Sequence, residues 1–344
     1  MKKIRALLAA ALLAHGASAA PPAFAKGADV SWVTELEARG YSWRTAAGLP
    51  KDCFALMKAL GFNAVRLRVW VDPKDGWNSG DDLAAKARRA AKLRLPVMLD
   101  FHYSDTWADP GKQIKPARWA ALDRTALIAA LTDHTARVLK AVKATGAEIA
   151  WVQIGNEVRP GFLWDADPAR SGALSDRTEG GRPVAAKNAR NFAAFLNAGA
   201  AAVRRTCPRA KIIVHCDHGD RWDDLVGVLE AAQGVDYDLF GVSLYPPRDW
   251  GPSIAACADN LARVKREYRK DTMVCEFGMP THPFDPARAA TAALLAALRK
   301  TAACRGVFYW EPESFPTPGG YTMGACTLDG KVAVPTPALA PFHR

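Results

Sequence analysis

Short apolar runs alternate with longer helical stretches along nearly the whole sequence, and this alternation restricts the fold more than any other feature. Eight runs have the length and residue types of strands: Asp29–Trp32, Ala64–Trp70, Val97–His102, Ile149–Glu157, Ile212–Asp217, Leu239–Tyr245, Met273–Glu276 and Val307–Trp310. The stretches between them are rich in Ala, Leu, Arg and Lys and predict helices: Asp82–Leu95, Arg124–Lys143, Lys187–Arg205, Trp222–Ala232, Pro252–Tyr268 and Pro286–Thr301. The same strand–helix alternation repeats along the sequence, and no part of it differs in composition from the rest. This pattern predicts a single α/β domain, a (β/α)8 TIM barrel.

The first 25 residues predict a secretory signal peptide instead of a part of this domain. Three basic residues near the start precede an apolar run, Ala6–Ala14, and small residues follow up to Ala25. These are the three parts of a cleavable signal, and the apolar run is too short to span a bilayer. We expect cleavage between Ala19 and Ala25, export to the periplasm or the cell exterior, and a catalytic barrel domain over 26–344.

Charge and cysteine usage exclude two classes of binding site. The formal net charge is +11, but the basic residues are scattered along the helical stretches and form no run interleaved with aromatics, which argues against nucleic-acid binding. The 7 cysteines include no Cys-x-x-Cys pair, which argues against a zinc knuckle. Export permits disulfides, and their pairing stays open, with at least one thiol left over. We expect no nucleic-acid partner, no membrane span and a monomer.

Three predicted loops are much longer than the rest, and all three follow the carboxyl end of a strand. They run over Tyr103–Trp119, Val158–Ala186 and Glu311–Val334, whereas the helix-to-strand connections are short. Functional loops of a barrel of this kind lie at the carboxyl ends of its strands. This asymmetry predicts that the functional mouth is on that face.

Polar residues occupy positions that should point into the barrel. Strand side chains alternate between two faces, so Val65, Leu67 and Val69 should face the helices while Arg66 and Arg68 point inward. The same alternation predicts further inward residues: Trp70, Asp100, His102, Trp151, Gln153, Gly155, Glu157, His215, Asp217, Ser243, Tyr245, Val274, Glu276, Phe308 and Trp310. A barrel interior built only for stability would contain Val, Ile and Leu. The polar set therefore indicates a site.

Two carboxylates in this set, Glu157 and Glu276, end the fourth and seventh predicted strands, on opposite sides of the mouth. A carboxylate pair without a cluster of metal ligands suggests cleavage of a glycosidic bond. One group must then be protonated and the other ionised, so their environments must separate their pKa values. Arg66 and Arg68 can hold one carboxylate in its charged form.

Aromatic residues gather at the predicted strand ends and in the long loops, where they suit a carbohydrate. The set consists of Trp70, Trp77, Tyr103, Trp107, Phe162, Trp164, Tyr245, Trp250, Trp310 and Tyr321. Sugar rings present apolar C–H faces that stack on such side chains, while their hydroxyls need polar neighbours. Together with the carboxylate pair, the aromatics predict a saccharide-binding cleft, although a single Trp would as often anchor a loop.

Five segments resemble the β-1,4-galactanases of glycoside hydrolase family 53: Gly27–Trp32, Asn63–Trp70, Leu99–Gln113, Val152–Glu157 and Gly306–Pro312. The family belongs to clan A, a group of retaining (β/α)8 glycosidases. The resemblance implies an exported, retaining endo-β-1,4-galactanase (arabinogalactan endo-β-1,4-galactanase) that hydrolyses the galactan side chains of pectin, arabinogalactan type I, and whose partner is the β-1,4-galactan polysaccharide.

The same resemblance implies a role for individual residues. It makes Glu157 the acid/base, Glu276 the nucleophile and Asn156 the group that binds the hydroxyl next to the reacting carbon. The other implied substrate-site residues are Arg66 and Tyr245, which would hold the nucleophile, His102 and Trp310, which would line the subsite of the cleaved sugar, and Asp105 and Trp107. Trp164 is expected at the substrate on a different ground: the length of the loop Val158–Ala186 and its aromatic residues predict that this loop walls part of the cleft.

The sequence departs from the family pattern in two places near the site. Glu276-Phe277-Gly278-Met279-Pro280 stands where the family usually has Glu-Thr-Ala-Tyr-Pro, and Ser243-Leu244-Tyr245 where it tends to have two tyrosines. The segment after Glu276 is short and lacks the acidic loop with which some bacterial members hold calcium. We therefore expect no cofactor and no required metal.

Three other functions remain open at this point. One is another clan A endo-β-1,4-glycanase, acting on mannan or xylan. A second is a galactan-binding barrel without activity, against which the intact Asn156, Glu157 and Glu276 argue. A third is a metal-dependent barrel enzyme, for which His215 with Asp217 offers too few ligands.

Overall fold

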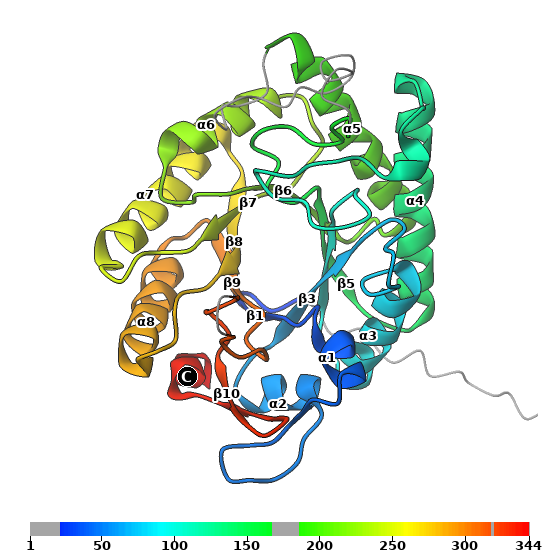
Figure 1. Cartoon of the computed structure of the whole chain (residues 1–344). Coiled ribbons are helices and arrows are strands. Elements are labelled where there is room, and N and C mark those ends of the chain that lie inside the picture. Colours follow the sequence, from blue (N-terminus) through cyan, green and yellow to red (C-terminus); the bar gives the residue numbers. More distant parts are fainter. Residues whose placement is uncertain (1–20, 167–185, 318–319, 344) are drawn as a thin grey trace, which may run out of the picture.

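Eight parallel strands close into a barrel, and helices surround it (Figure 1). The computed structural model describes residues 21–166, 186–317 and 320–343. The barrel strands in order are β1 (Ala25–Asp29), β3 (Ala64–Val69), β4 (Val97–Phe101), β5 (Ile149–Ile154), β6 (Lys211–Cys216), β7 (Leu239–Leu244), β8 (Asp271–Phe277) and β9 (Cys304–Trp310). The predicted (β/α)8 barrel is confirmed.

The helices comprise the six with predicted ranges, each confirmed within a few residues at both ends, and two further ones, α1 and α2, for which no range was predicted. They are α1 (Val33–Ala38), α2 (Cys53–Ala59), α3 (Gly80–Lys92), α4 (Arg124–Ala144), α5 (Ala186–Thr206), α6 (Trp222–Ala231), α7 (Gly251–Tyr268) and α8 (Phe284–Lys300), with 3-10 turns η1 (Ala117–Trp119) and η4 (Pro337–His343). Polar caps define several starts, because a side-chain oxygen satisfies a free backbone N–H of the first turn. Ser79 accepts from Asp82 N at α3, and Asp123 accepts from Ala126 N at α4.

The first barrel strand lies four residues earlier than predicted. The prediction placed it at Asp29–Trp32, but β1 covers Ala25–Asp29 and Trp32 caps helix α1. The true strand has no apolar run because the barrel interior is crowded there: a Cβ on Gly27 would lie 2.0 Å from a ring atom of Phe308. Small residues are required at this position, so the strand lacks the usual sequence signal.

A small second sheet was not predicted. It consists of β10 (Cys326–Asp329), β11 (Val332–Pro335) and β2 (Ser42–Trp43), and it lies below the barrel in Figure 1. β10 and β11 form an antiparallel hairpin inside what the sequence predicted as a long loop, and β11 pairs with β2 from the other end of the chain. Strands of two to four residues are too short to show a periodicity.

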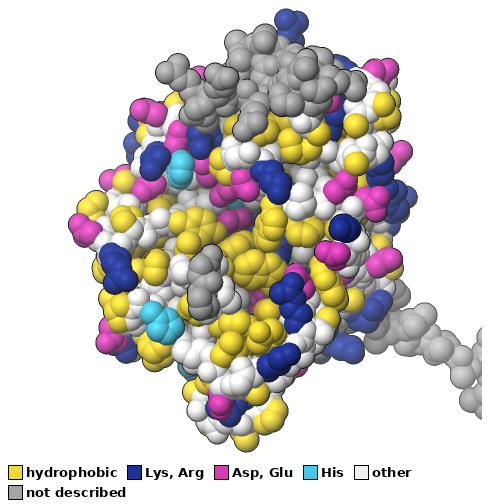
Figure 2. Space-filling model, in the orientation of Figure 1, with side chains coloured by type: hydrophobic (Ala, Val, Ile, Leu, Met, Phe, Trp, Pro, Cys, Tyr) yellow, Lys and Arg dark blue, Asp and Glu magenta, His cyan; other side chains and the backbone are white. Residues whose placement is uncertain are grey.

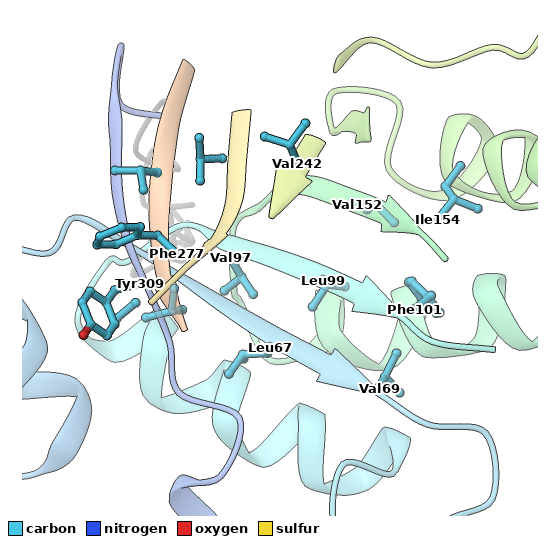
Figure 3. Close-up of a cluster of buried hydrophobic side chains, with 14 of the residues drawn as sticks. Leu67, Val69, Val97, Leu99, Phe101, Val152, Ile154, Val242, Phe277 and Tyr309 are labelled. Atoms are coloured by element: carbon cyan, nitrogen blue, oxygen red, sulfur yellow. The ribbon is translucent and has the colours of Figure 1, made fainter. Parts of the chain in front are cut away.

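Two apolar layers fill the molecule on either side of the barrel wall. Between the strands and the helices, alternate residues of neighbouring strands, such as Leu67, Leu99 and Val152, pack together (Figure 3). Inside the barrel, an apolar cluster includes Trp151 and Phe308. The polar inward residues lie on the same strands nearer their carboxyl ends, so the interior is apolar at one end and polar at the mouth.

A β-bulge on β8 changes which of its side chains enter the barrel. Val274 pairs with Val242 of β7, but the next pair is Glu276 with Ser243, so Cys275 is an extra residue. The register against β9 also shifts between Val274 and Phe277. Val274 therefore packs on the helix side, and the prediction that it points inward is wrong. The bulge lets both Cys275 and Glu276 face the interior.

All seven cysteines are free thiols, and six of them are buried. Among residues 21–166, 186–317 and 320–343, no helix combines the length and the apolarity that a bilayer span requires. The predicted signal peptide lies largely outside these residues.

Candidate active site

A cavity of about 310 Å³ opens at the carboxyl ends of the barrel strands. Its lining combines the two carboxylates with aromatic and amide side chains: His102, Trp107, Ala108, Asp109, Asn156, Glu157, Tyr245, Glu276, Trp310, Tyr321 and Met323. Apolar side chains gather over the centre of the barrel on this face (Figure 2). Seven of the residues that the sequence assigned to the site meet here.

A sharp bend, not strand alternation, places Glu157. β5 ends at Ile154, and the chain then turns through Gly155 at φ 79° and Glu157 at φ 47°. A Cβ at Gly155 would lie 2.5 Å from a methyl group of Val158, so this position requires glycine. A left-handed conformation is unfavourable for Glu, and such strain is typical of functional residues.

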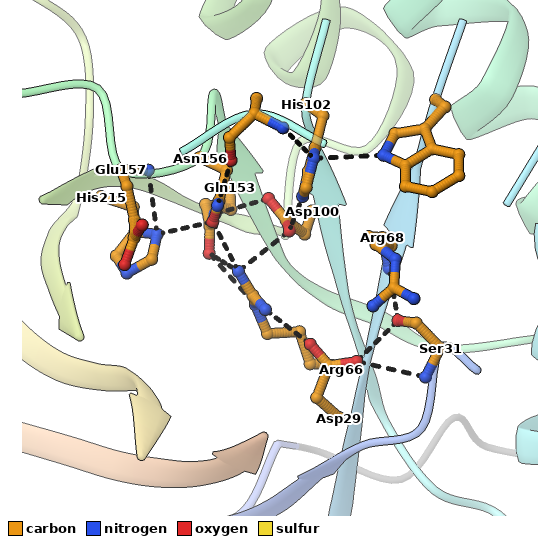
Figure 4. Close-up of polar contacts among 12 residues, drawn as sticks. Asp29, Ser31, Arg66, Arg68, Asp100, His102, Gln153, Asn156, Glu157 and His215 are labelled. Carbon is orange, nitrogen blue, oxygen red and sulfur yellow. Dashed lines mark hydrogen bonds and ion pairs between the residues drawn. The ribbon is translucent and has the colours of Figure 1, made fainter. Parts of the chain in front are cut away.

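Arg66 of β3 contacts acidic groups from three other strands, of which Figure 4 shows Asp29 and Asp100. The side chain is 1% exposed, and its guanidinium lies 2.5 Å from Asp29 Oδ2, 2.9 Å from Asp100 Oδ2 and 2.9 Å from Glu276 Oε1. It also donates to Asn156 Oδ1 at 2.9 Å. A buried arginine needs such compensation, and in return it stabilises the ionised carboxylates around it.

Glu276 is held at both oxygens. Arg66 contacts Oε1, and the Tyr245 hydroxyl donates to Oε2 at 2.7 Å, so both expected contacts are present. Burial raises the pKa of Glu276, while Arg66 and the Tyr245 hydrogen bond act in the opposite direction. These two contacts favour the charged form that a nucleophile needs.

Arg68 does not take part in holding Glu276. It pairs with Glu311, and its guanidinium lies 4.2 Å from the ring centroid of Trp107. The expectation that both arginines stabilise the nucleophile is therefore wrong for Arg68. Its guanidinium instead packs against the aromatic rings beside the cavity.

Glu157 has no positive partner among the described residues. Its Oε1 lies 2.6 Å from Ser243 Oγ, and the side chain is buried. Burial, followed by the nearby charges of Glu276 and Asp217, raises the pKa of Glu157 well above its usual range. The proton of the pair therefore resides on Glu157, in agreement with an acid role.

The two carboxyl groups are close together. One oxygen of Glu157, one oxygen of Glu276 and a ring nitrogen of His215 all lie within 4.8 Å of one another. Retaining glycosidases have carboxyl groups about 5–5.5 Å apart, whereas inverting enzymes leave about 6.5–9.5 Å for a water molecule. The spacing matches the retaining geometry.

The same three residues could be mistaken for a metal site. Arg66 brings a positive charge within 2.9 Å of Glu276, and both ring nitrogens of His215 have side-chain partners, Asn156 and Ser243. A cation would have to displace these contacts and tolerate the guanidinium. The donor set suits a proton and not a metal ion.

His102 is fixed in one tautomer. Its Nε2 lies 2.9 Å from Asp100 Oδ2, and its Nδ1 accepts from Trp70 Nε1 at 3.2 Å and from Ala108 N at 3.0 Å. Two donors at Nδ1 require that the proton is on Nε2. One face of the cavity therefore has a fixed ring next to Trp107.

A larger cavity of about 580 Å³ continues from Trp107 and Tyr321, which line both. This cavity is called the aromatic cavity below, because its wall combines charged and polar residues with six aromatic ones: Trp32, Trp70, Trp77, Trp107, Phe315 and Tyr321. Asp105 also lies here, and its carboxylate accepts from the backbone N–H of Asp72 and of Ala117, which joins two loops. Trp32 was missed because the prediction placed it inside a strand.

Trp164 does not join the other predicted site residues. It is 3% exposed, its indole N–H donates to Pro160 O, and its backbone pairs with Gln113 and Lys115. It lines neither of the two cavities. Together with the buried Phe162, it anchors the loop after β5, so the expected substrate contact is not supported.

Three further residues complete the site, and the sequence only marked them as inward. Gln153, His215 and Ser243 are all buried beside the carboxylates. Period two had placed them on the correct face, but nothing local linked any of them to Glu157 or Glu276. Their partners come from other strands.

Comparison with known proteins gives a consistent set of similarities. The family model described as glycosyl hydrolase family 53 matches residues 25–292. An arabinogalactan endo-beta-1,4-galactanase of Thermothelomyces thermophilus is 32% identical over 315 residues, covering 83% of this chain and 89% of that protein. An endo-beta-1,4-galactanase of Bacillus subtilis is 31% identical over 327 residues, covering 85% and 71%. A solved fungal beta-1,4-galactanase superposes with a TM-score of 0.77 at 27% identity, covering 92% of this chain and 98% of that one.

Proposed function

The chain belongs to glycosyl hydrolase family 53 and is a glycoside hydrolase, and we propose that it is a retaining endo-β-1,4-galactanase acting on the galactan side chains of pectin, arabinogalactan type I. The observation that carries the mechanism is the buried Glu157–Glu276 pair, with oxygens within 4.8 Å. The names of the curated relatives, arabinogalactan endo-beta-1,4-galactanase and endo-beta-1,4-galactanase, support the substrate.

The reaction proceeds in two displacements. Glu276, held ionised by Arg66 and Tyr245, attacks the anomeric carbon, while Glu157 transfers its proton to the glycosidic oxygen as that bond breaks. A covalent galactosyl–Glu276 ester results. Glu157, now ionised, takes a proton from water as the water oxygen attacks the same carbon and releases Glu276. Two inversions give net retention, and both carboxyl groups return to their starting states.

Asn156 is positioned to bind the hydroxyl next to the reacting carbon. Its side-chain oxygen accepts from Arg66 and Gln153, so the amide cannot rotate. Its nitrogen carries two hydrogens and donates one to Ala108 O at 2.8 Å. The second hydrogen can reach a sugar hydroxyl in the cavity.

The direction of the bound chain follows from where the two cavities meet. They share Trp107, whose ring centroid lies 6.1 Å from that of His102, the residue expected to line the subsite of the cleaved sugar. We therefore place the glycone side, the sugars toward the non-reducing end, in the aromatic cavity. Its size and its five indole and phenol rings suit several galactosyl units, as internal cleavage requires.

The substrate is tested by incubating the purified protein with linear β-1,4-galactan, β-1,4-mannan and β-1,4-xylan, and following products by chromatography and proton NMR. We expect galactan to be cut to short oligomers whose new reducing ends first appear as the β anomer. Preference for mannan, release of monomer alone, or binding without hydrolysis would contradict the proposal.

We further propose that the protein is exported as a monomer after removal of its signal peptide. Residues 1–20 lie outside the described part of the chain, but Ala25 is fully buried in β1. Cleavage before Ala25 would leave the barrel intact. N-terminal sequencing of the mature protein and light scattering test these two points.

A further inference from the structure

Behind Glu157 runs a buried chain of hydrogen bonds that crosses three strands. Ser243 Oγ lies 2.6 Å from Glu157 Oε1 and 3.0 Å from His215 Nε2. The other ring nitrogen of His215, Nδ1, lies 3.0 Å from Asn156 Oδ1 (Figure 4). His215 is 0% and Ser243 1% exposed, so each hydrogen in this chain must be accounted for by the protein itself.

The orientation of the Asn156 amide is fixed by its neighbours. Its oxygen accepts from Arg66 Nη2 at 2.9 Å, and a guanidinium can only donate. Its nitrogen donates to Ala108 O, and a carbonyl can only accept. Rotation of the amide by 180° would create two repulsive contacts at once. The atom facing His215 is therefore an oxygen.

The tautomer of His215 follows from that oxygen. An acceptor 3.0 Å from Nδ1 requires a hydrogen on Nδ1. The backbone N–H of Glu157 also points toward Nδ1, but at 3.4 Å it is the longer contact. Burial and the nearby Arg66 lower the pKa of His215 well below its usual range, so the ring is neutral. Nε2 is then a bare acceptor that faces Ser243.

Ser243 has a single hydroxyl hydrogen and two possible acceptors. We propose that Ser243 and His215 form a hydrogen-bond switch that follows the protonation state of Glu157. While Glu157 is protonated, Ser243 accepts from it and donates to His215 Nε2. Once Glu157 is ionised, the Ser243 hydroxyl rotates and donates to the carboxylate instead. Both residues act through Glu157 and are positioning residues.

This switch rests on the proposed galactanase function and adds to it, because it gives Glu157 a different hydrogen-bond arrangement in each of the two displacements. In the first displacement, two hydrogen bonds hold the protonated acid in place. In the second, the rotated hydroxyl steadies the carboxylate that receives the proton from water. His215 favours the arrangement in which Glu157 is protonated, because ionisation of Glu157 leaves Nε2 of His215 without a hydrogen-bond donor.

The charges around the switch come from several elements and stay the same in the variants proposed below. Glu157 faces Glu276 of β8, Asp217 after β6 and Asp109 of the loop after β4. His215 faces Arg66 of β3, and Asp100 and His102 at the end of β4. Substitution of Ser243 or of the neutral His215 changes hydrogen bonding without changing charge.

The test is a titration of Glu157 without substrate, by NMR of ¹³C-carboxyl-labelled glutamate, with Glu157 assigned from the resonance missing in Glu157→Gln. Ser243→Ala removes the donor that the described residues offer to the ionised form and should raise the pKa of Glu157 by about one unit, the effect of one hydrogen bond to a charged group. His215→Phe keeps a ring of similar size and frees Ser243 to donate, so it should lower that pKa.

The double variant decides whether the effect of His215 passes through Ser243. In the Ser243→Ala background, His215→Phe should have no further effect, whereas independent effects would add. His215→Gln, which can present an oxygen at the place of Nε2, should titrate like the wild type. Thr291→Val removes a buried hydroxyl that bonds only within α8 and should also leave the titration unchanged.

Two results would overturn the switch. One is a shift of the Glu157 pKa in the same direction in both single variants, and the other is a full effect of His215→Phe on that pKa in the Ser243→Ala background. Circular dichroism checks folding, and His215→Met replaces His215→Phe if the latter does not fold. The basic limb of the kcat/KM profile on galactan should move with the titration. Because the titration uses no substrate, it tests the switch independently of whether galactan is the polymer that the enzyme cleaves.

Discussion

A carboxyl oxygen of Glu157 and a carboxyl oxygen of Glu276 lie within 4.8 Å of each other across the barrel mouth. Two buried carboxylates at this distance cannot both be ionised at low cost. Arg66 contacts Glu276 and not Glu157, so the negative charge belongs on Glu276 and the proton on Glu157. The pair is ready for the first displacement before any substrate binds.

This division of roles predicts that the two alanine variants fail in different ways. Glu276→Ala should lose activity by several orders of magnitude on all substrates, because no glycosyl–enzyme can form. Glu157→Ala should keep activity on an aryl β-galactoside whose leaving group needs no proton. With azide, Glu157→Ala should give the β-galactosyl azide and Glu276→Ala the α anomer, measured by proton NMR. Anomers found the other way round would exchange the two roles.

Tyr245→Phe should move the acid limb of the pH profile upward. The hydroxyl of Tyr245 donates to Glu276 Oε2 at 2.7 Å and stabilises the ionised form, so its removal raises the pKa of Glu276. The enzyme then loses its nucleophile at a higher pH. A hydrogen bond to a charged group contributes about 1.5–3 kcal/mol, so the acid limb should move upward by roughly one to two pH units. Tyr237→Phe, remote from the site, is the matched control; an unmoved acid limb in Tyr245→Phe would refute the assignment.

Trp164→Ala should destabilise the fold with little effect on substrate binding. The indole is 3% exposed and its loop pairs with the Gln113–Lys115 segment. Loss of a buried Trp costs about 3–5 kcal/mol, measurable as a lower free energy of unfolding in urea. KM for galactan should change less than about twofold. A raised KM with unchanged stability would restore the substrate contact that the sequence suggested.

Trp77→Ala should show the opposite behaviour. Trp77 lines the aromatic cavity and is only partly buried. Removal of a sugar platform that is away from the reacting bond weakens ground state and transition state alike, so KM rises and kcat is unchanged. We expect a roughly tenfold higher KM on polymeric galactan, about 1.4 kcal/mol, and a smaller effect on the shortest substrates. Equal effects on long and short substrates would place Trp77 outside the glycone cleft.

Activity should survive chelation. The acidic groups at the catalytic centre are matched by Arg66 and hydrogen bonds, and none of the proposed steps uses a metal. Dialysis against EDTA should leave both kcat/KM and Tm unchanged, and added calcium should change neither. Loss of activity that calcium restores would reveal a metal site that the sequence did not predict.

The sequence by itself determined the barrel, its helices and the face on which the site lies. These features follow from local periodicity: apolar runs repeat with helical stretches, and alternation along β3 places Arg66 inward beside Leu67 and Val65. Their places at predicted strand ends and the family resemblance marked Glu157, Glu276, Asn156, Tyr245 and Trp310 as site residues, and all five lie at one mouth. Where the local signal was missing, the prediction failed. This happened at β1, where Gly27 is required because Phe308 leaves no room for a larger side chain.

Only the tertiary structure decided how the site works. The bulge that turns Glu276 inward exists because β8 must pair with both β7 and β9 in shifted register. The proton lies on Glu157 because Arg66, on another strand, contacts Glu276 and not Glu157. Trp164 is buried by the loop it anchors. Register, charge balance and burial depend on contacts between distant segments, and a pattern along one chain does not contain those contacts.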